Sequence, residues 1–422
     1  MNGIWPELGI RPADILLPAD CDMNRWSVVA CDQYTSQPEY WERVREYVGS
    51  APSTLNLTFP EVWIDSPDAA ERIADIHRNM HRYQDEGIFR RIEDALIYVE
   101  RQLSDGLVRR GLLGAVDLEQ YDYSSDWKGL IRATEGVVPK RLPPRVAVRQ
   151  GADLELPHVL MLIDDPLKTV IEPLADEKDQ MKKLYDFDLM EHGGHIRGFL
   201  LTDAQKDRLS SALAALADPS AFNFRWGTEG EPPMLFAVGD GNHSLASAKQ
   251  VYEASKGGPD EAFARFSLVE VGNVYDDSLI FESINRVVFG TDPQRLLKEL
   301  LEYYPGAYYG VGEGHCFTYC CGREEGHITI PEPRAALPIG SLQIFLEDYL
   351  SEHAGQIDYI HGSNVVRSLG SRPGNIGFIV DPIDKESLFE TVIFEGRLPR
   401  KTFSMGQAND KRYYLEARRI RG

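Results

Sequence analysis

Cysteine, long apolar runs and positive charge are all scarce in this chain of 422 residues. It has only five cysteines, an odd number, so we expect reduced thiols rather than a disulfide framework. No apolar run is long enough to span a bilayer, and the N-terminus has neither the positive stretch nor the apolar core of a leader peptide. These absences predict a cytoplasmic protein.

The deficit of positive charge limits the possible partners. Acidic residues outnumber basic ones by 66 to 45, and the formal net charge is −21 at pH 7. Such an excess disfavours nonspecific binding to nucleic acid or to an anionic membrane, so we expect neither as a partner. The sequence leaves the oligomeric state open.

The positive charge that is present is concentrated in two stretches. Over residues 391–422, basic residues outnumber acidic ones eight to three, and a second stretch contains Arg132, Lys140, Arg141, Arg145 and Arg149. This concentration suggests a small anionic ligand, although salt bridges to the acidic remainder of the chain would also explain it.

Recognisable nucleotide-binding signatures are missing too, since the chain has no clean Rossmann or P-loop motif. Short apolar runs typical of strands are interspersed with stretches of helical spacing, which favours an α+β or mixed α/β protein. We expect a core over residues 1–290 and a smaller C-terminal α/β segment over residues 291–422 that carries the basic tail.

The stretch 233–249 organises the rest of the chain. Residues 234–238 form an apolar run expected of a buried strand, and apolar residues recur at helical spacing from Leu245 onward. A glycine turn before a helix N-terminus offers backbone N–H groups to an anion, and a side chain of the turn can cap the helix. The turn consists of Gly239, Asp240, Gly241, Asn242, His243 and Ser244.

Two interpretations of this turn stay open. In the first, Asn242 is an ordinary cap between a strand and a helix. In the second, which we favour, the helix mouth is a site, because a His and an Asp together at such a place also serve acid–base chemistry.

Other polar residues follow predicted strands. Asp164 and Asp165 end the apolar run 159–163, where they could bind Mg²⁺ or simply form a turn. Residues 25–34 predict a strand that runs into a polar turn. Prolines between residues 139 and 145 predict an extended loop that carries arginines, and residues 315–330 predict a β-hairpin.

Five motifs occur together and in order over nearly the whole chain. They are Thr134-Glu135, Leu162-Ile163-Asp164-Asp165, Gly239-Asp240-Gly241-Asn242-His243, Val269-Glu270-Val271-Gly272-Asn273 and Leu398-Pro399-Arg400-Lys401-Thr402-Phe403. With them the chain resembles the domain of unknown function 1015 family, which is grouped with the ParB/sulfiredoxin-like superfamily. The superfamily includes nucleotide-dependent free-serine kinases and CTP-binding ParB proteins.

The resemblance implies a ParB/sulfiredoxin-like core and a nucleotide cofactor, ATP, ADP or CTP, with Mg²⁺. In many relatives the central turn reads Asp-Gly-His-His-Arg. Here Asn242 replaces the first His and Ser244 replaces the Arg, so Arg132, Arg141 or Arg400 would have to supply the phosphate donor.

Two classes of function follow. The first is a kinase-like phosphotransferase that acts on a small hydroxylated metabolite, with acid–base chemistry from His243, Asp240 and Glu135. Phosphate would then be held by the turn and by the basic residues Arg132, Arg141, Arg145, Arg400 and Lys401. The second is a non-catalytic module that senses a nucleotide or binds another ligand. We expect His243 and Asp240 to line a polar pocket and both basic stretches to converge on it.

Overall fold

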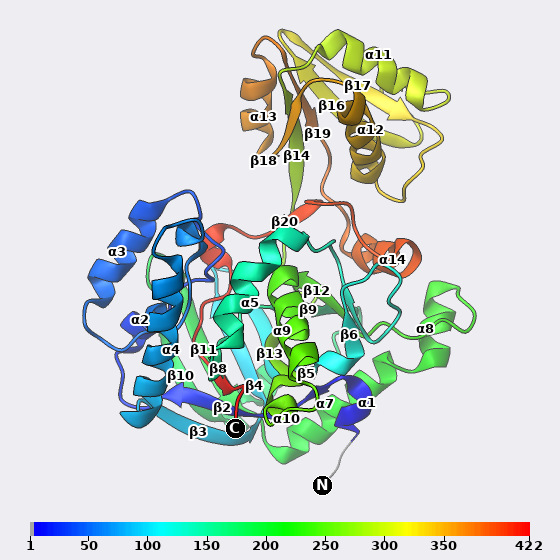
Figure 1. Ribbon diagram of the computed structural model, residues 1–422. Coiled ribbons are helices and arrows are strands. Elements are labelled where there is room, and N and C mark those ends of the chain that lie inside the picture. The colour runs from blue at the N-terminus through cyan, green and yellow to red at the C-terminus, as the bar shows by residue number, and fades with distance from the viewer. Residues whose placement is uncertain (1–3) are drawn as a thin grey trace. The chain divides into compact units, whose positions relative to one another are not determined.

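The computed structural model describes residues 4–422 and has the mixed α/β composition expected from the sequence (Figure 1). The chain forms two compact units. Unit 1 combines the residues up to Leu279 with Gln407–Gly422, and unit 2 spans Ile280–Gly406. None of the helices within residues 4–422 combines the length and the apolar character needed to cross a bilayer.

A large mixed sheet forms the centre of unit 1. Its strands follow one another in the order β10 (Lys182–Asp188), β11 (His195–Leu200), β4 (Ile97–Gln102), β5 (Val108–Asp117), β13 (Phe266–Asn273), β9 (Leu160–Ile163), β12 (Phe236–Asp240), β7 (Ile131–Ala133) and β6 (Tyr121–Asp122), and β1 (Ile10–Arg11) pairs with β5. Strand β12 runs parallel to β7 but antiparallel to β9. The C-terminal ends of β7 and β12 therefore meet the N-terminal end of β9, and we call this margin the site edge.

Both faces of the sheet are covered. Successive residues alternate between two apolar clusters, because neighbouring side chains of a strand point to opposite faces. In β4, Ile97 and Val99 belong to one cluster, whereas Tyr98 belongs to the other. The first cluster includes segments from both ends of the chain, and the second includes Leu209, Leu245 and other residues of α7 (Asp203–Leu216) and α9 (Asn242–Ser255).

The remaining elements of unit 1 surround this sheet. They are α1 (Trp5–Leu8), α2 (Met23–Trp26), α3 (Pro38–Val48), α4 (Ala69–Asp85), α5 (Leu142–Gln150), α6 (Leu174–Glu177), α8 (Pro219–Trp226), α10 (Glu261–Ala264), the pair β2 (Ala13–Pro18) and β3 (Phe89–Ala95), and the pair β8 (Leu154–Glu155) and β21 (Arg418–Arg419). Helices α5 and α9 lie side by side (Figure 1).

Two sequence-based predictions about local structure were wrong. The proline-rich stretch is no extended loop, because a 3₁₀ turn at Pro139–Arg141 leads into α5, whose prolines stand in its first turn. Proline is tolerated there because the first N–H groups of a helix have no partner within it. The segment expected to be a strand from residue 25 begins as α2, capped by Asp22.

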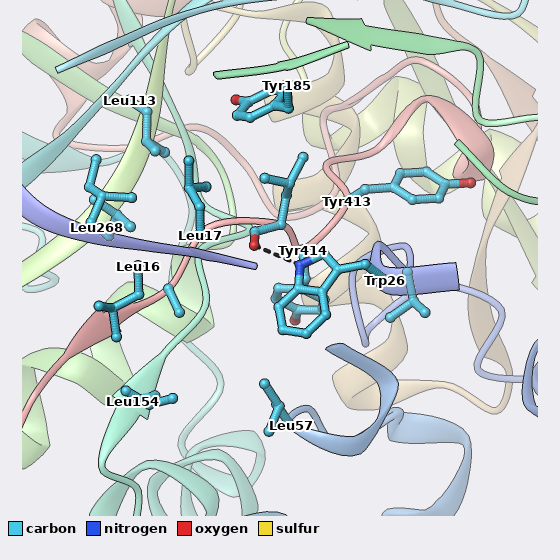
Figure 2. Packing of buried hydrophobic residues seen from close by; sticks show 14 of the residues in the cluster. Leu16, Leu17, Trp26, Leu57, Leu113, Leu154, Tyr185, Leu268, Tyr413 and Tyr414 are labelled. Atoms are coloured by element: carbon cyan, nitrogen blue, oxygen red, sulfur yellow. Dashed lines mark hydrogen bonds between the residues drawn. The ribbon is translucent and has the colours of Figure 1, made fainter. Parts of the chain in front are cut away.

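The C-terminal tail completes the N-terminal part of unit 1. Leu16 and Ala417 exchange backbone hydrogen bonds, and the N–H of Tyr414 donates to the carbonyl of Val28. Trp26 is fully buried and donates from Nε1 to the carbonyl of Leu415 at 2.9 Å (Figure 2). Segments almost 400 residues apart in sequence therefore share one core.

Unit 2 has its own sheet. Its strands follow the order β15 (Tyr308–Tyr309), β17 (Glu324–Ile330), β16 (His315–Cys321), β19 (Asn375–Ile379), β14 (Phe281–Phe289) and β18 (Gln356–His361), and β20 (Phe403–Met405) also pairs with β14. The predicted hairpin is confirmed as β16 and β17. The helices are α11 (Pro293–Tyr303), α12 (Pro338–Glu352), α13 (Ser363–Gly370) and α14 (Lys385–Glu395).

This division differs from the one expected at residue 290. Strand β14 pairs with β18 and β19 and so belongs to unit 2, and the tail from Gln407 onward returns to unit 1. The pairing partners of a strand depend on distant segments, so the local pattern of the sequence does not show them.

Candidate functional site

The turn between β12 and α9 lies at the site edge and has the predicted strand–turn–helix form. Gly241 is the N-cap of α9 with φ +84°, a conformation that L side chains rarely adopt. A Cβ at this position would lie 3.1 Å from Cα of Val159. The glycine is therefore needed both for the turn and for the close approach of β9.

Asn242 is not the helix cap that the sequence suggested. It is the first residue of α9, it is buried, and Gly241 caps the helix without a side-chain hydrogen bond. Its Oδ1 accepts from the N–H of Thr134 at 3.2 Å, and its Nδ2 donates to Thr134 Oγ1 and to the carbonyl of Val238. The amide thus joins the start of α9 to the ends of β7 and β12, a contact between strands that no local pattern predicts.

His243 is half-buried on the first turn of α9. Its Nε2 accepts a hydrogen bond from the backbone N–H of Val138 at 3.0 Å, and its carbonyl accepts from Ser247 Oγ. A ring nitrogen that accepts a hydrogen bond carries no proton, so the imidazole is neutral and protonated on Nδ1. In this state His243 fixes the loop between β7 and α5.

Asp240 ends β12 and holds a cation. Its Oδ2 lies 3.1 Å from Nζ of Lys411, and its Oδ1 accepts from the N–H of Gly241. Lys411 is largely buried and comes from the C-terminal tail. One member of the basic tail therefore reaches the central turn, although the residues of the tail named from the sequence were Arg400 and Lys401.

Asp32 belongs to the same polar environment. Burial would raise the pKa of this carboxyl, but the charge of His158, a hydrogen bond from Gln33 and the charge of Lys411 outweigh burial and lower it. Asp32 therefore stays ionised at neutral pH.

A cavity of about 120 Å³ lies beside the first two turns of α9. Ser244 and Ser247 line it from α9, whereas His243 and Asp240 are not among its lining residues. The other polar residues that line it are Cys31, Thr58, Glu61, Arg145, Arg149, Glu155, His158 and Tyr414. The site edge therefore combines a polar turn with an adjacent cavity.

Glu61 and Arg145 form an ion pair in this cavity. The Nη2 atom of Arg145 lies 2.6 Å from Oε1 and 2.7 Å from Oε2 of Glu61, but its hydrogen bond is directed at Oε2. Burial raises the pKa of Glu61 to about 7, even though Arg145 acts in the opposite direction. Glu61 therefore changes its protonation near neutral pH, as a general base must.

His158 and Tyr414 complete the polar wall. The Tyr414 hydroxyl lies 2.6 Å from His158 Nδ1 and accepts from the N–H of Cys31 at 3.3 Å. Both residues line the cavity, so their contact forms a polar part of its lining.

The predicted basic residues do not all reach this site. Arg132 is buried and donates to the carbonyls of Lys128, Gly129 and Pro232, so its guanidinium is used by its own loop and by the segment before β12. Arg141 is exposed, and Arg145 lines the cavity.

Glu135 is half-buried and follows β7 at the site edge. Arg400 and Lys401 belong to unit 2, where their carbonyls accept from Arg286. A contribution of these two residues to the site in unit 1 stays a prediction.

The two carboxylates proposed for Mg²⁺ have protein partners. Asp164 Oδ1 accepts from Arg225 at 2.7 Å and from the Tyr275 hydroxyl at 3.1 Å. Asp165 is buried and accepts from the N–H groups of Thr169 and Val170, as a turn residue does. Across residues 4–422, no group of three or more His, Cys, Asp or Glu side chains is arranged to hold a metal ion. Asp165 thus has the hydrogen bonds of a turn residue, and binding of Mg²⁺ by Asp164 and Asp165 stays a prediction.

Sequence reasoning missed Glu61, His158, Lys411 and Tyr414 as members of the site. They come from three separate segments, since Lys411 and Tyr414 share the C-terminal tail, and none belongs to a motif of characteristic spacing. The only available signal was the basic character of the tail, which the sequence shows for the stretch as a whole and not for Lys411 in particular.

Comparisons with known proteins give a family but no activity. No curated protein matches the chain. Solved structures to which the chain shows some similarity include a free serine kinase in complex with AMP (10% identity, TM-score 0.38, covering 71% of this chain and 90% of that one). A conserved hypothetical protein from Pyrococcus furiosus is similar at 10% identity and TM-score 0.37, covering 71% and 93%.

A third solved structure is SbnI with a C-terminal truncation from Staphylococcus aureus, at 11% identity and TM-score 0.36, covering 70% of this chain and 82% of that one. Likenesses this distant carry no argument about chemistry. The family described as "Protein of unknown function (DUF1015)" matches residues 10–418, and the chain belongs to that family.

Proposed function

We propose that unit 1 is a kinase-like phosphotransferase that uses ATP, ADP or CTP to phosphorylate a small hydroxylated metabolite. One observation carries this proposal: acidic, basic and hydroxyl groups from six distant segments meet around the first turn of α9. The ParB/sulfiredoxin-like relation, the cytoplasmic location and the use of Mg²⁺ with the nucleotide belong to the same proposal.

The start of α9 is suited to hold a phosphate. The helix has fourteen residues, and the first N–H groups of such a helix carry partial positive charge. The Ser244 hydroxyl makes no hydrogen bond within the described chain. Lys411 supplies a full positive charge next to the turn, held there by Asp240. These groups together provide the donors and the cation that phosphoryl transfer requires.

The proton of the substrate hydroxyl would pass to a carboxylate of the site edge. His243 is less suited than the sequence suggested, because its Nε2 already accepts from Val138. Glu135 follows β7, the neighbour of β12, and Glu61 titrates near neutral pH. In this proposal His243 positions the loop and Asp240 positions Lys411, while Glu135 or Glu61 is the base.

Turnover tests the proposal directly. ADP, AMP or inorganic phosphate released from ATP, ADP or CTP is measured over a panel of small hydroxylated metabolites. We expect Lys411→Met to lower the rate about 10-fold to 100-fold, since hydrogen bonds to charged groups contribute about 1.5–3 kcal/mol. The control is Lys298→Met, which removes an exposed lysine of α11. Equal rates for the two variants would contradict the role of Lys411.

A specific observation also supports the second candidate, a non-catalytic nucleotide-binding module. Asp240 is paired with Lys411 and Glu61 with Arg145, so the charges of the site edge are balanced without a substrate. Saturable binding of ATP, ADP or CTP with no released product over the whole panel would favour this module over the enzyme.

A further inference from the structure

We propose that a second cavity of unit 1, between α1, β1 and the start of β13, binds a small monoanionic carboxylate with an apolar body through Arg11. The cavity has a volume of about 320 Å³. Among the described residues, it shares no lining residue with the cavity beside α9. The proposal therefore needs no part of the phosphotransferase function.

Three strands and a short helix form the walls of this cavity. Arg11 lies on β1, which pairs with β5, and Phe266 at the start of β13 pairs with Asp117 at the end of β5. Gly9 ends α1 with φ +67° and leads the chain into β1, so Trp5 of α1 lines the same cavity. Backbone pairing thus fixes the positions of its polar and aromatic residues.

Arg11 presents unused donors to the cavity. Its guanidinium carbon lies 4.7 Å from the centroid of the Phe266 ring, a cation–π contact that holds the guanidinium against the ring. Nε donates to the carbonyl of Pro12 at 3.2 Å, whereas Nη1 and Nη2 make no hydrogen bond or ion pair with residues 4–422. Because Arg11 is exposed and lines the cavity, a ligand can reach both nitrogens.

The other charged groups of the cavity are paired with one another or with a neighbour. Arg265 bonds Asp117 through Nε at 2.9 Å and through Nη2 at 2.6 Å. Asp94 lies 3.0 Å from Nζ of Lys206. Neither carboxylate is within ion-pair distance of Arg11 in the described chain, so the guanidinium of Arg11 adds one positive charge that the lining does not neutralise.

This surplus favours a carboxylate over a phosphate group. The charge of Arg11 also acts on Asp14, but that carboxylate is bonded by Arg91 at 2.6 Å. A carboxylate carries one negative charge and accepts two parallel hydrogen bonds from the fork of Nη1 and Nη2. A phosphate monoester carries about −1.5 to −2 at pH 7 and would place the additional charge near Asp94 and Asp117.

The remaining lining suits an apolar body. It consists largely of Trp5, Pro6, Ile10, Pro12 and Phe266. Benzene binds in an engineered apolar cavity of about 150 Å³, so a cavity of about 320 Å³ has room for a ligand of roughly ten to thirteen non-hydrogen atoms. An aromatic ring that carries a carboxylate fits within this limit.

Binding is tested on the full chain at pH 7 by ligand-observed NMR titrations. Benzoate is compared with benzamide and benzamidine, which have the same size but are neutral and cationic, and with phenyl phosphate. We expect benzoate to bind about tenfold more tightly than benzamide, as expected of hydrogen bonds between charged groups, and benzamidine to bind least. Equal affinities of benzoate and benzamide, or tighter binding of benzamidine or phenyl phosphate than of benzoate, would overturn the proposal.

Three variants locate the bound carboxylate. Arg11→Gln should reduce the preference for benzoate over benzamide to within about threefold, because the charged fork is lost. Arg323→Gln, the matched control, removes an exposed arginine between β16 and β17 of unit 2 and should keep the wild-type preference. Trp5→Ala should weaken both compounds by at least about threefold through loss of an aromatic wall. A wild-type preference in Arg11→Gln, or unchanged affinities in Trp5→Ala, would show that benzoate does not bind in this cavity.

Discussion

At the scale of single residues, Asn242 shows how a polar side chain can join elements rather than serve a ligand. Its amide contacts Thr134 and Val238 from the start of α9, where a cap was expected. The turn therefore keeps its shape through a buried side chain, and the neighbouring residues Ser244 and Lys411 are positioned without taking part in that contact.

Replacing Asn242 by Ala should destabilise unit 1 by about 1–3 kcal/mol, because the buried N–H of Thr134 would lose its acceptor. Urea unfolding followed by far-UV circular dichroism measures the change. Asn24→Ala is the control, since Asn24 is exposed in the short helix α2. If Asn242→Ala loses no more stability than Asn24→Ala, the hydrogen bonds of Asn242 to Thr134 and Val238 do not stabilise unit 1.

The carboxyl groups of Asp32 and Glu61 differ in pKa because their surroundings differ. The pKa of Asp32 is lowered by neighbouring charges and a hydrogen bond, whereas burial raises the pKa of Glu61 to about 7. Carboxyl groups whose environments shift their pKa values in opposite directions are the usual basis of an acid–base division. Here Asp32 provides a fixed negative charge, and Glu61 is the group that exchanges a proton near neutral pH.

At the scale of elements, the C-terminal tail is the segment on which the site depends most. It supplies Lys411 and Tyr414 and is fixed in the core of unit 1 by a buried ion network. Arg412 bonds Glu270 of β13 at 2.8 Å and Glu416 at 2.6 Å, and all three side chains are nearly inaccessible. Part of the basic tail thus serves salt bridges to acidic residues, the alternative that the sequence left open.

Arg412→Ala should destabilise the protein by about 3–5 kcal/mol, since it removes the cation shared by two buried carboxylates and leaves Glu270 only the longer contact with Arg109 at 3.5 Å. Chemical denaturation measures the loss. Arg419→Ala serves as the control, because Arg419 is an exposed arginine of the same tail. A destabilisation below about 1 kcal/mol would show that other groups stabilise the carboxylates of Glu270 and Glu416 when Arg412 is absent.

At the scale of the whole molecule, unit 2 is an insertion in the chain of unit 1. The chain enters it at Ile280 and leaves it at Gly406, and near these points Phe281 pairs with Met405 in antiparallel register. The two ends of the insertion are therefore close together, about 5 Å between paired Cα atoms. Insertions with neighbouring ends are well tolerated by a host domain.

Joining Leu279 to Gln407 through a short Gly-Ser linker should therefore give a unit 1 that folds alone, and residues 280–406 should fold as a separate unit. Thermal unfolding by circular dichroism should show one cooperative transition for each fragment. As a comparison, a fragment that ends at Leu279 lacks the tail and should not fold cooperatively, because Trp26 and Glu270 lose their partners. A shortened unit 1 without a cooperative transition would contradict the division.

The sequence alone predicted the features that depend on local chemistry. The α/β class and the hairpin of β16 and β17 follow from periodicity and from turn residues, which act over a few positions. The strand, glycine turn and helix around Gly241 were predictable for the same reason, and the scarcity of positive charge directed attention to the basic tail.

Only the tertiary structure decided which of these features form the site. Glu61, His158 and Lys411 come together because β9, β12 and the returning tail meet at one edge of the sheet, and strand pairing over hundreds of residues leaves no local pattern. It also decided that Asn242 joins α9 to the ends of β7 and β12 and that Arg412 pairs with buried carboxylates. The role of a polar residue depends on its burial and its partners. The sequence supplies the polar groups, and their chemistry depends on which of them are buried together.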